Sequence, residues 1–152
     1  MAHDNTQVTR RLIEEVWNNG KLQVLEELLD PSFEGRDPLR GPLNAEQYRN
    51  GVKGFRLAFP DLRFELNAVV ASDTHVTTRW TMRCTHLGPF LGTESSGKSA
   101  QVTGLNLAEL RNGKLVSEYS EWDALALFRQ LGLEDVTLPL AVRRPVQQQA
   151  RP

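Results

Sequence analysis

The stretch QVTGLNLAELRNGKLVSEYSEWD, residues 101–123, decides the fold class. Two strand-like runs, QVTGLNLAEL (101–110) and KLVSEYSEWD (114–123), flank the dipeptide Asn112-Gly113. An Asn-Gly pair between two such runs is a strong signal for a two-residue β-hairpin, because both turn residues need positive φ angles. This part of the chain is therefore predicted to form two antiparallel strands.

Two further strand-like runs precede the hairpin. DLRFELNAVV (61–70) and HVTTRWTMRCTH (75–86) alternate apolar with polar residues, which is the period-two pattern of a strand with one buried face. GPFLGTESSGK (88–98) is rich in Gly and Ser and is typical of a loop. The second half of the chain therefore predicts four strands.

Helices are expected mainly ahead of these strands. Residues 4–20 carry apolar side chains four apart, as on one face of a helix, and residues 21–30 predict a second, shorter helix. Asn44 opens a third helix, with Gln47 placed three residues later for a capping box. The run ALALFRQLG (124–132) predicts one or two helical turns at the end.

The order of these elements predicts the fold class. Helices followed by antiparallel strands indicate an α+β domain, with the helices on one face of a curved sheet. The length of 152 residues indicates one domain. We expect this domain to span residues 1–138 and residues 139–152 to form a disordered tail.

Composition excludes several classes of function. A formal net charge of −1 gives no electrostatic reason to bind nucleic acid or an anionic membrane. Residues 1–11 lack the apolar region of a signal peptide, so a cytoplasmic setting is expected. The single Cys84 rules out an internal disulfide, and His3, His75 and His86 lack metal-ligand spacing. No metal or cofactor is expected.

Carboxylates gather in EYSEWD (118–123), just before the final helix. In a regular strand, Glu121 and Asp123 share a face with Leu115, and Glu118 lies on the other. We expect Glu121 and Asp123 to point into a cavity or line its mouth, and Glu118 to point away. The alternative is that Glu121 and Asp123 meet solvent at a strand end, as most carboxylates do.

Three other polar residues are candidates for a site. His86 has a side chain suited to proton transfer, and Asn106 lies among apolar residues of a strand, where a buried amide needs partners. Arg36 precedes Asp37 and Pro38 and could stabilise an enolate or carbonyl oxygen. The alternatives are a turn residue for His86, a structural tie for Asn106, and an exposed pair for Arg36 and Asp37.

Large apolar side chains spread over the chain are candidates to bind a flat hydrophobic substrate. Each of them taken alone is as well explained by ordinary core packing. They are Trp17, Phe33, Phe59, Trp80, Met82 and Tyr119.

The chain resembles the SnoaL-like polyketide cyclases, within the nuclear transport factor 2-like superfamily, over about residues 6–133. The resemblance rests on RRLIEEVWNNGKLQVLEELL, AFPDLRFEL, TRWTMRCTHLGPFLG, VTGLNLAELRNGKLVSEYSEWD and LFRQLG. It implies a conical α+β barrel, in which a curved antiparallel sheet wraps around helices and encloses an internal cavity. It also implies homodimers or higher homo-oligomers through the sheet's outer face.

The resemblance also implies a reaction. Family cyclases close the last ring of an anthracycline-type aromatic polyketide by an intramolecular aldol reaction without a cofactor. They use an Asp just before the Trp of the last strand and a cavity His on the preceding strand. Glu121 stands at the first position and Asn106 at the second. Arg36 stands where the wider family often has a His, in a motif like HDP.

These departures favour a second activity known in such families, hydroxylation without flavin or metal, in antibiotic biosynthesis. In this hypothesis Glu121 or Asp123 is the base that removes a proton from the polycyclic aromatic substrate. Arg36 and Asn106 stabilise the oxyanion, and His86 is a candidate proton partner. One alternative is an aldol cyclase with Glu121 as acid/base. Another is a non-catalytic module that binds a small ligand.

Overall fold

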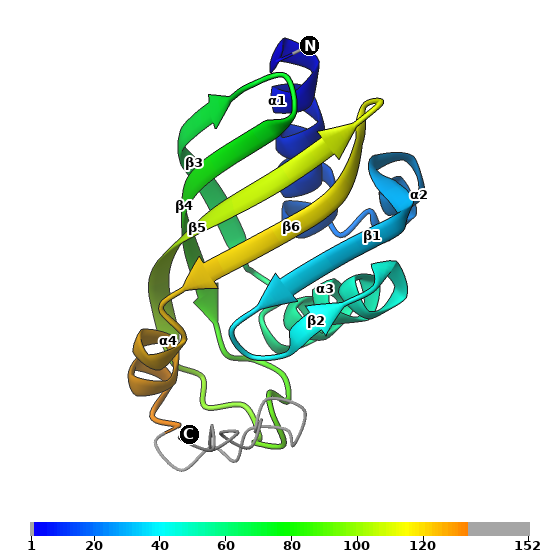
Figure 1. Cartoon of the computed structure of the whole chain (residues 1–152). Coiled ribbons are helices and arrows are strands. Elements are labelled where there is room, and N and C mark those ends of the chain that lie inside the picture. The colour runs from blue at the N-terminus through cyan, green and yellow to red at the C-terminus, as the bar shows by residue number, and fades with distance from the viewer. Residues whose placement is uncertain (1, 134–152) are drawn as a thin grey trace, which may run out of the picture.

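A six-stranded sheet dominates the computed structural model, which describes residues 2–133 (Figure 1). The tail expected at residues 139–152 lies outside the described residues. The strand order is β2-β1-β6-β5-β4-β3, and all neighbours are antiparallel except the parallel pair β1–β6. The strands are β1 (Leu29–Asp37), β2 (Gly41–Leu43), β3 (Arg63–Ala71), β4 (His75–Thr85), β5 (Ser99–Arg111) and β6 (Lys114–Trp122).

Helices α1 and α3 lie behind one face of the curved sheet, and the sheet stays open, with β2 and β3 at its edges (Figure 1). This arrangement confirms the predicted α+β class. The helical segments are α1 (Ala2–Arg11), the π-helical η1 (Leu12–Asn18), the 3-10 turn η2 (Leu22–Val24), α2 (Leu25–Leu28), α3 (Ala45–Ala58) and α4 (Ala124–Leu131). No helix among residues 2–133 is long and apolar enough to cross a membrane.

The first two helices differ from the prediction. The helix expected as regular over residues 4–20 widens into π-helical turns from Leu12 to Asn18. The helix expected at residues 21–30 is shorter, because Leu29 already begins β1. Apolar spacing reports the buried face of a helix, whereas these boundaries depend on contacts made by other elements.

Short local sequence signals account for the start of α3, the turn of the last hairpin and the end of α4. Asn44 and Gln47 form the predicted capping box at the start of α3, with hydrogen bonds of 2.9 Å and 2.8 Å. Asn112 and Gly113 both have positive φ, 51° and 73°, as the predicted hairpin turn requires. Gly132 ends α4 in the left-handed conformation, with a φ of 71°.

A β-bulge in the last hairpin reverses the predicted faces of β6. Leu110 pairs with Leu115, but the next pair is Glu109 with Ser117, so β6 has one extra residue at Val116. A one-residue offset exchanges the two faces of a strand beyond that point. Consequently Glu118, which was predicted to point away from the cavity, points into it.

Two clusters of buried side chains make up the core. One gathers around Leu12, Val52 and Leu115, and the other around Phe59, Met82 and Leu127. Trp17 packs against both clusters, so the space that it faces lies between them. This space is the candidate site.

Candidate functional site

A cavity of about 60 Å³, continuous with solvent on one side, lies between the sheet and helices η1 and α3. Most of the wall is aromatic, with Trp17, Phe55, Phe64, Trp80 and Trp122 among the lining residues. Neighbouring rings meet edge to face, at centroid distances of 5.2 Å for Trp17–Phe64 and 4.9 Å for Phe64–Trp80. Such a wall suits a flat apolar ligand.

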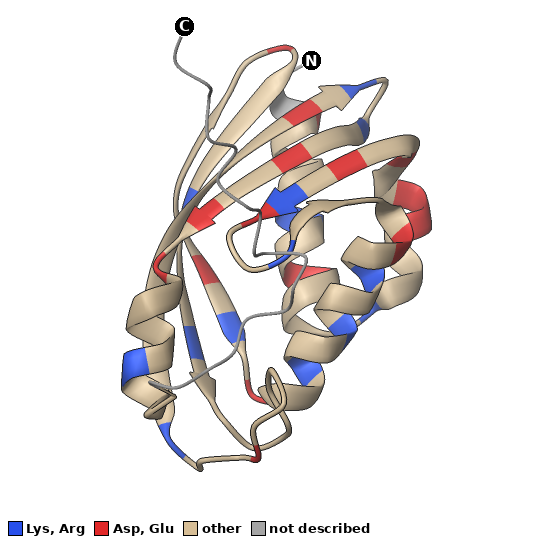
Figure 2. Cartoon of the chain, turned by 60° about the horizontal axis from the view of Figure 1, so that its bottom comes forward, with Lys and Arg blue, Asp and Glu red and all other residues tan. Residues whose placement is uncertain are grey.

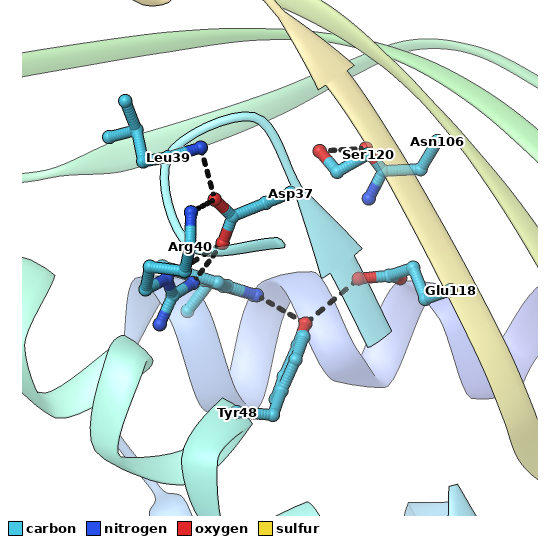
Figure 3. Close-up of polar contacts among 8 residues, drawn as sticks. Asp37, Leu39, Arg40, Tyr48, Asn106, Glu118 and Ser120 are labelled. Carbon is cyan, nitrogen blue, oxygen red and sulfur yellow. Dashed lines mark hydrogen bonds and ion pairs between the residues drawn. The ribbon is translucent and has the colours of Figure 1, made fainter. Parts of the chain in front are cut away.

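The carboxyl group of Glu118 is buried in this wall. The residue is 6% exposed, and its Oε1 accepts a hydrogen bond of 3.0 Å from the Tyr48 hydroxyl (Figure 3). Burial raises the pKa of Glu118 above its usual range, while hydrogen bonds from Tyr48 and Asn106 act in the opposite direction. A raised pKa makes a carboxyl group a stronger base when it is ionised, which suits it to proton transfer with a substrate.

Tyr48 connects Glu118 to Trp17 of η1. Its hydroxyl accepts a hydrogen bond of 3.0 Å from the Trp17 indole nitrogen and donates one to Glu118. Burial, and then the charge of Glu118, raise the pKa of Tyr48 well above its usual value. Tyr48 therefore stays neutral and acts as a hydrogen-bond donor to Glu118 rather than as a second base.

Asn106 lies beside Glu118 on the neighbouring strand. Its Oδ1 accepts hydrogen bonds from the Trp80 indole nitrogen at 2.8 Å and from the Ser120 hydroxyl at 2.9 Å. Figure 3 shows its amide nitrogen turned to the side on which Glu118 lies. A carboxyl and an amide donor thus face the same space, as a base and an oxyanion-stabilising group require.

The sequence predicted Arg36 as the fixed positive charge of the site, but the less exposed arginine that lines the cavity is Arg40. The Arg40 guanidinium is ion-paired with Asp37, whose Oδ1 also accepts from the backbone nitrogens of Leu39 and Arg40 (Figure 3). Gly51 leaves room for it, since a Cβ there would lie 1.4 Å from Arg40 Nη1. Arg40 also acts on Tyr48, whose pKa its charge lowers slightly against the larger effect of burial.

Several predicted site residues do line the cavity. Trp17, Trp80, Met82 and Asn106 face it as expected, and Arg36 contributes to its rim. The Arg36 side chain is exposed, however, so the better-placed cation is Arg40.

Other predicted binding residues lie elsewhere. Phe33 and Phe59 are buried in the core clusters and are not among the residues that line the cavity. Tyr119 is 47% exposed and lies opposite the exposed Leu107 on the outer face of the sheet. Their predicted placement in the cavity is wrong. Phe33 lies on the side of β1 that packs into the core. Tyr119 lies on the outer face of β6, because the bulge at Val116 turns it outward.

The predicted placement of both carboxylates is also wrong. Glu121 is exposed and pairs with the exposed Leu105 on the outer face. Asp123 is exposed at the start of α4, where its side chain accepts a hydrogen bond of 2.9 Å from the backbone nitrogen of Ala126. Asp123 is thus a helix cap.

His86 does not reach the cavity either. It is fully buried, and its Nδ1 accepts a hydrogen bond of 3.1 Å from the backbone nitrogen of Ser96. Its ring packs 5.6 Å from that of Phe59 and 6.2 Å from that of Phe90. Its observed contacts tie the loop of residues 87–98 to the core.

Sequence reasoning missed Glu118, Tyr48, Ser120 and Arg40 as site residues. One signal was available for Glu118 and Ser120. Leu115-Val116 is a pair of adjacent apolar residues after a hairpin turn, which is consistent with a bulge. Counting inward from Trp122 instead of from Leu115 would have placed Ser120 and Glu118 in the cavity.

No metal cluster accompanies these groups: among the side chains of residues 4–133, no three His, Cys, Asp or Glu gather closely enough to hold a metal ion.

Comparisons with known proteins agree with this architecture. The family model described as SnoaL-like polyketide cyclase matches residues 7–131. IdmH, a proposed polyketide cyclase from Streptomyces antibioticus, has a TM-score of 0.75 and 26% identity over 84% of this chain and 98% of its own. A proposed SnoaL-like polyketide cyclase from Jannaschia sp. CCS1 has a TM-score of 0.80 and 23% identity over 86% and 92%.

A third solved structure carries a different activity in its name. AclR, a proposed hydroxylase from Streptomyces galilaeus, has a TM-score of 0.77 and 20% identity over 87% of this chain and 98% of its own. No curated protein matches. At these identities the structures of AclR and of the Jannaschia protein show a common fold.

Proposed function

Because the chain belongs to the SnoaL-like polyketide cyclase family, we propose that it is an acid–base enzyme that modifies a polycyclic aromatic polyketide. The observation that carries the proposal is the buried carboxyl of Glu118 in an aromatic cavity, beside the amide of Asn106. The chemistry needs no metal or tightly bound cofactor, since a carboxylate base and a hydrogen-bond donor suffice for proton transfer.

The first step is deprotonation of the substrate. Ionised Glu118 accepts a proton from an activated C–H group next to a carbonyl, and the carbonyl oxygen takes up the negative charge. An N–H group of Asn106 donates a hydrogen bond to this oxygen. Tyr48 keeps the Glu118 carboxyl in place through its hydrogen bond. The aromatic wall holds the flat rings against these groups.

The second step is ring closure. The carbanion attacks a second carbonyl of the same substrate, a C–C bond forms, and the new alkoxide takes back the proton that Glu118 accepted. The reaction is balanced without any co-reactant. A carboxyl whose pKa is raised by burial is suited to both transfers. We therefore place intramolecular aldol cyclisation first, with Glu118 as acid/base.

Hydroxylation of an anthracycline-type intermediate in antibiotic biosynthesis is the second candidate. Asn106 stands where the family cyclases have a His, and an amide can supply the oxyanion stabilisation that this reaction needs. Here the substrate anion reacts with dioxygen and a C–O bond forms. The second oxygen atom leaves as water only if a reductant supplies two electrons. A diffusible reduced flavin is therefore part of this alternative.

Product mass distinguishes the two reactions. Purified protein is incubated with late aromatic polyketide intermediates, in air and without oxygen, with and without reduced flavin. A product of unchanged mass and altered retention, formed with or without air, is the expected result and indicates cyclisation. A product heavier by one oxygen, formed only in air, indicates hydroxylation. Tight binding with no product under any condition would contradict both and indicate a ligand-binding module.

The outer face of the sheet supports a homodimer as part of this proposal. Val70, Leu105, Leu107 and Tyr119 are 70%, 52%, 46% and 47% exposed there. Thr77 pairs with both Val70 and Leu107, and Leu107 with Tyr119, so three of them lie in one row across the sheet. Acidic residues lie on several strands of the sheet and basic residues on α3 (Figure 2), and the formal net charge of −1 favours a small-molecule substrate over nucleic acid or an anionic membrane.

Light scattering coupled to gel filtration tests the homodimer. We expect the wild-type protein to elute at twice the chain mass and Leu107→Asp to elute as a folded monomer, because a buried charge opposes association. An unchanged mass for Leu107→Asp would show that this face is not the interface.

A further inference from the structure

The orientation of the Asn106 amide follows from its partners. An indole N–H can only donate a hydrogen bond, so the atom that it contacts at 2.8 Å must be the amide oxygen of Asn106. The Ser120 hydroxyl contacts the same oxygen at 2.9 Å. With both bonds made to the oxygen, the amide nitrogen is left to face Glu118, as Figure 3 shows.

Three adjacent strands build this arrangement. Trp80 is on β4, Asn106 is on β5, and Ser120 is paired directly with Asn106 from β6. Trp80 is 4% exposed, and its indole lies over Gly104, where a Cβ would be 2.3 Å from Trp80 Cζ2. Only glycine at this position lets the indole lie close enough to the strand to reach the Asn106 oxygen.

We propose that Trp80 and Ser120 are positioning residues that fix the Asn106 amide with its nitrogen toward Glu118 and the substrate. The proposal rests on the proposed role of Glu118 as the base. An amide nitrogen carries two hydrogens, so one N–H serves Glu118 and the other serves the substrate oxygen. Without the two bonds to its oxygen, the amide could rotate and present an acceptor to Glu118 instead.

Fixing the amide has a consequence for the base. A donor beside Glu118 favours the ionised carboxyl, and the Asn106 side chain indeed lowers the pKa of Glu118 against the larger effect of burial. After burial and the Tyr48 hydrogen bond, the orientation of this amide is therefore a third influence on the pKa of Glu118.

Titration of Glu118 by carbon NMR tests the proposal without any substrate. The protein is labelled with ¹³C in the glutamate carboxyl groups, and the Glu118 signal is identified by its loss in Glu118→Gln. Asn106→Asp retains an acceptor for Trp80 and Ser120 but places a carboxylate oxygen opposite Glu118. Because two adjacent carboxyls share a proton, the Glu118 midpoint is expected to rise by at least about one pH unit.

Ser120→Ala provides the second variant. It removes one of the two hydrogen bonds to the Asn106 oxygen and leaves the amide group itself unchanged. We therefore expect a smaller rise in the Glu118 midpoint. Ser120→Thr, which keeps the hydroxyl, should restore the wild-type value. Ser117→Ala is the matched control, because Ser117 is on the same strand but pairs with Glu109, and it should leave the midpoint unchanged.

Two results would overturn the proposal. One is a wild-type Glu118 midpoint in a folded Asn106→Asp protein. The other is a loss of thermal stability in Ser120→Ala without any change in the midpoint, which would make Ser120 a purely structural residue. Neither readout depends on turnover, so a failed search for products would refute the proposed function and leave this test valid.

Discussion

Replacing Tyr48 with Phe removes one hydroxyl group that makes two hydrogen bonds in the cavity wall. Tyr48 is 5% exposed, and its hydroxyl connects the Trp17 indole to Glu118 through two contacts of 3.0 Å. The Phe ring keeps the edge-to-face packing against Phe33, at a centroid distance of 5.3 Å, and against Trp17. The substitution therefore tests the hydrogen bonds and leaves the packing in place.

The expected loss of stability follows from these two contacts. A hydrogen bond to a charged group contributes about 1.5–3 kcal/mol, and a buried donor without a partner costs about 1–3 kcal/mol. The first cost applies to ionised Glu118, and the second applies at its lower end to the Trp17 N–H, whose contact is part-buried. We expect Tyr48→Phe to lower the free energy of unfolding by about 2.5–4 kcal/mol where Glu118 is ionised. This is a large part of the stability of a typical domain.

The loss depends on pH in a defined direction. The pKa of Glu118 is raised by burial in the folded protein, whereas a Glu in an unfolded chain titrates near about 4.3. Wild-type stability therefore falls as pH rises from the unfolded value through the folded value. The Tyr48 hydroxyl lowers the folded pKa, so its removal raises that pKa further and extends the fall. The difference between Tyr48→Phe and wild type should grow with pH.

Urea unfolding at about pH 4, near the pKa of an unfolded Glu, and at about pH 8 measures this difference. Tyr119→Phe is the control, because Tyr119 is the second of the two tyrosines and its ring is exposed. It should change stability by less than about 0.5 kcal/mol at either pH. An equal loss for Tyr48→Phe at both pH values would refute the bond to ionised Glu118.

Three further substitutions test single elements of the structure. Gly104→Ala places a Cβ 2.3 Å from Trp80 Cζ2 and should lower the free energy of unfolding in urea by about 1–3 kcal/mol. Gly54→Ala in α3 is the control, because its Cβ meets no atom within 4 Å and the change should be neutral or stabilising. Equal effects of the two substitutions would contradict the packing argument. His86→Phe removes the acceptor of the Ser96 N–H, so limited proteolysis should cut residues 87–98 faster than in wild type, and an unchanged rate would show that His86 does not hold the loop. Asn44→Ala removes the α3 cap and should cost about 1 kcal/mol in thermal unfolding; a loss near zero would mean that the capping box is not formed in solution.

Local chemistry explains which parts of the fold the sequence predicts well. The Asn44–Gln47 cap and the Asn112-Gly113 turn depend on residues close together in the chain, and both form as expected. The π-helical turns that end at Asn18 depend on distant contacts. The Asn18 side chain bonds both backbone groups of Phe64, at 3.0 Å and 2.7 Å. Spacing of apolar residues within one helix carries no information about such contacts.

The candidate site was predicted only in part, for a related reason. Asn106, Trp17 and Trp80 were placed in the cavity correctly, because a polar residue among apolar ones and large aromatics are visible in the sequence. The carboxylate Glu118 was assigned to the wrong face of β6, because one extra residue at Val116 exchanges the two faces of the strand beyond it. A bulge is a property of a strand pair, so Glu118 became visible only when the register with β5 was known.

The rate of product formation by Glu118→Gln and Glu121→Gln, measured side by side with the same polyketide intermediate, tests the central claim most directly. Gln at position 118 keeps an acceptor for Tyr48 but cannot accept a proton, so kcat/KM should fall by about 10²–10⁴-fold while the protein stays folded. Glu121→Gln, on the outer face, should react at the wild-type rate. The opposite result, an active Glu118→Gln and an inactive Glu121→Gln, would contradict the assignment of Glu118 as the base.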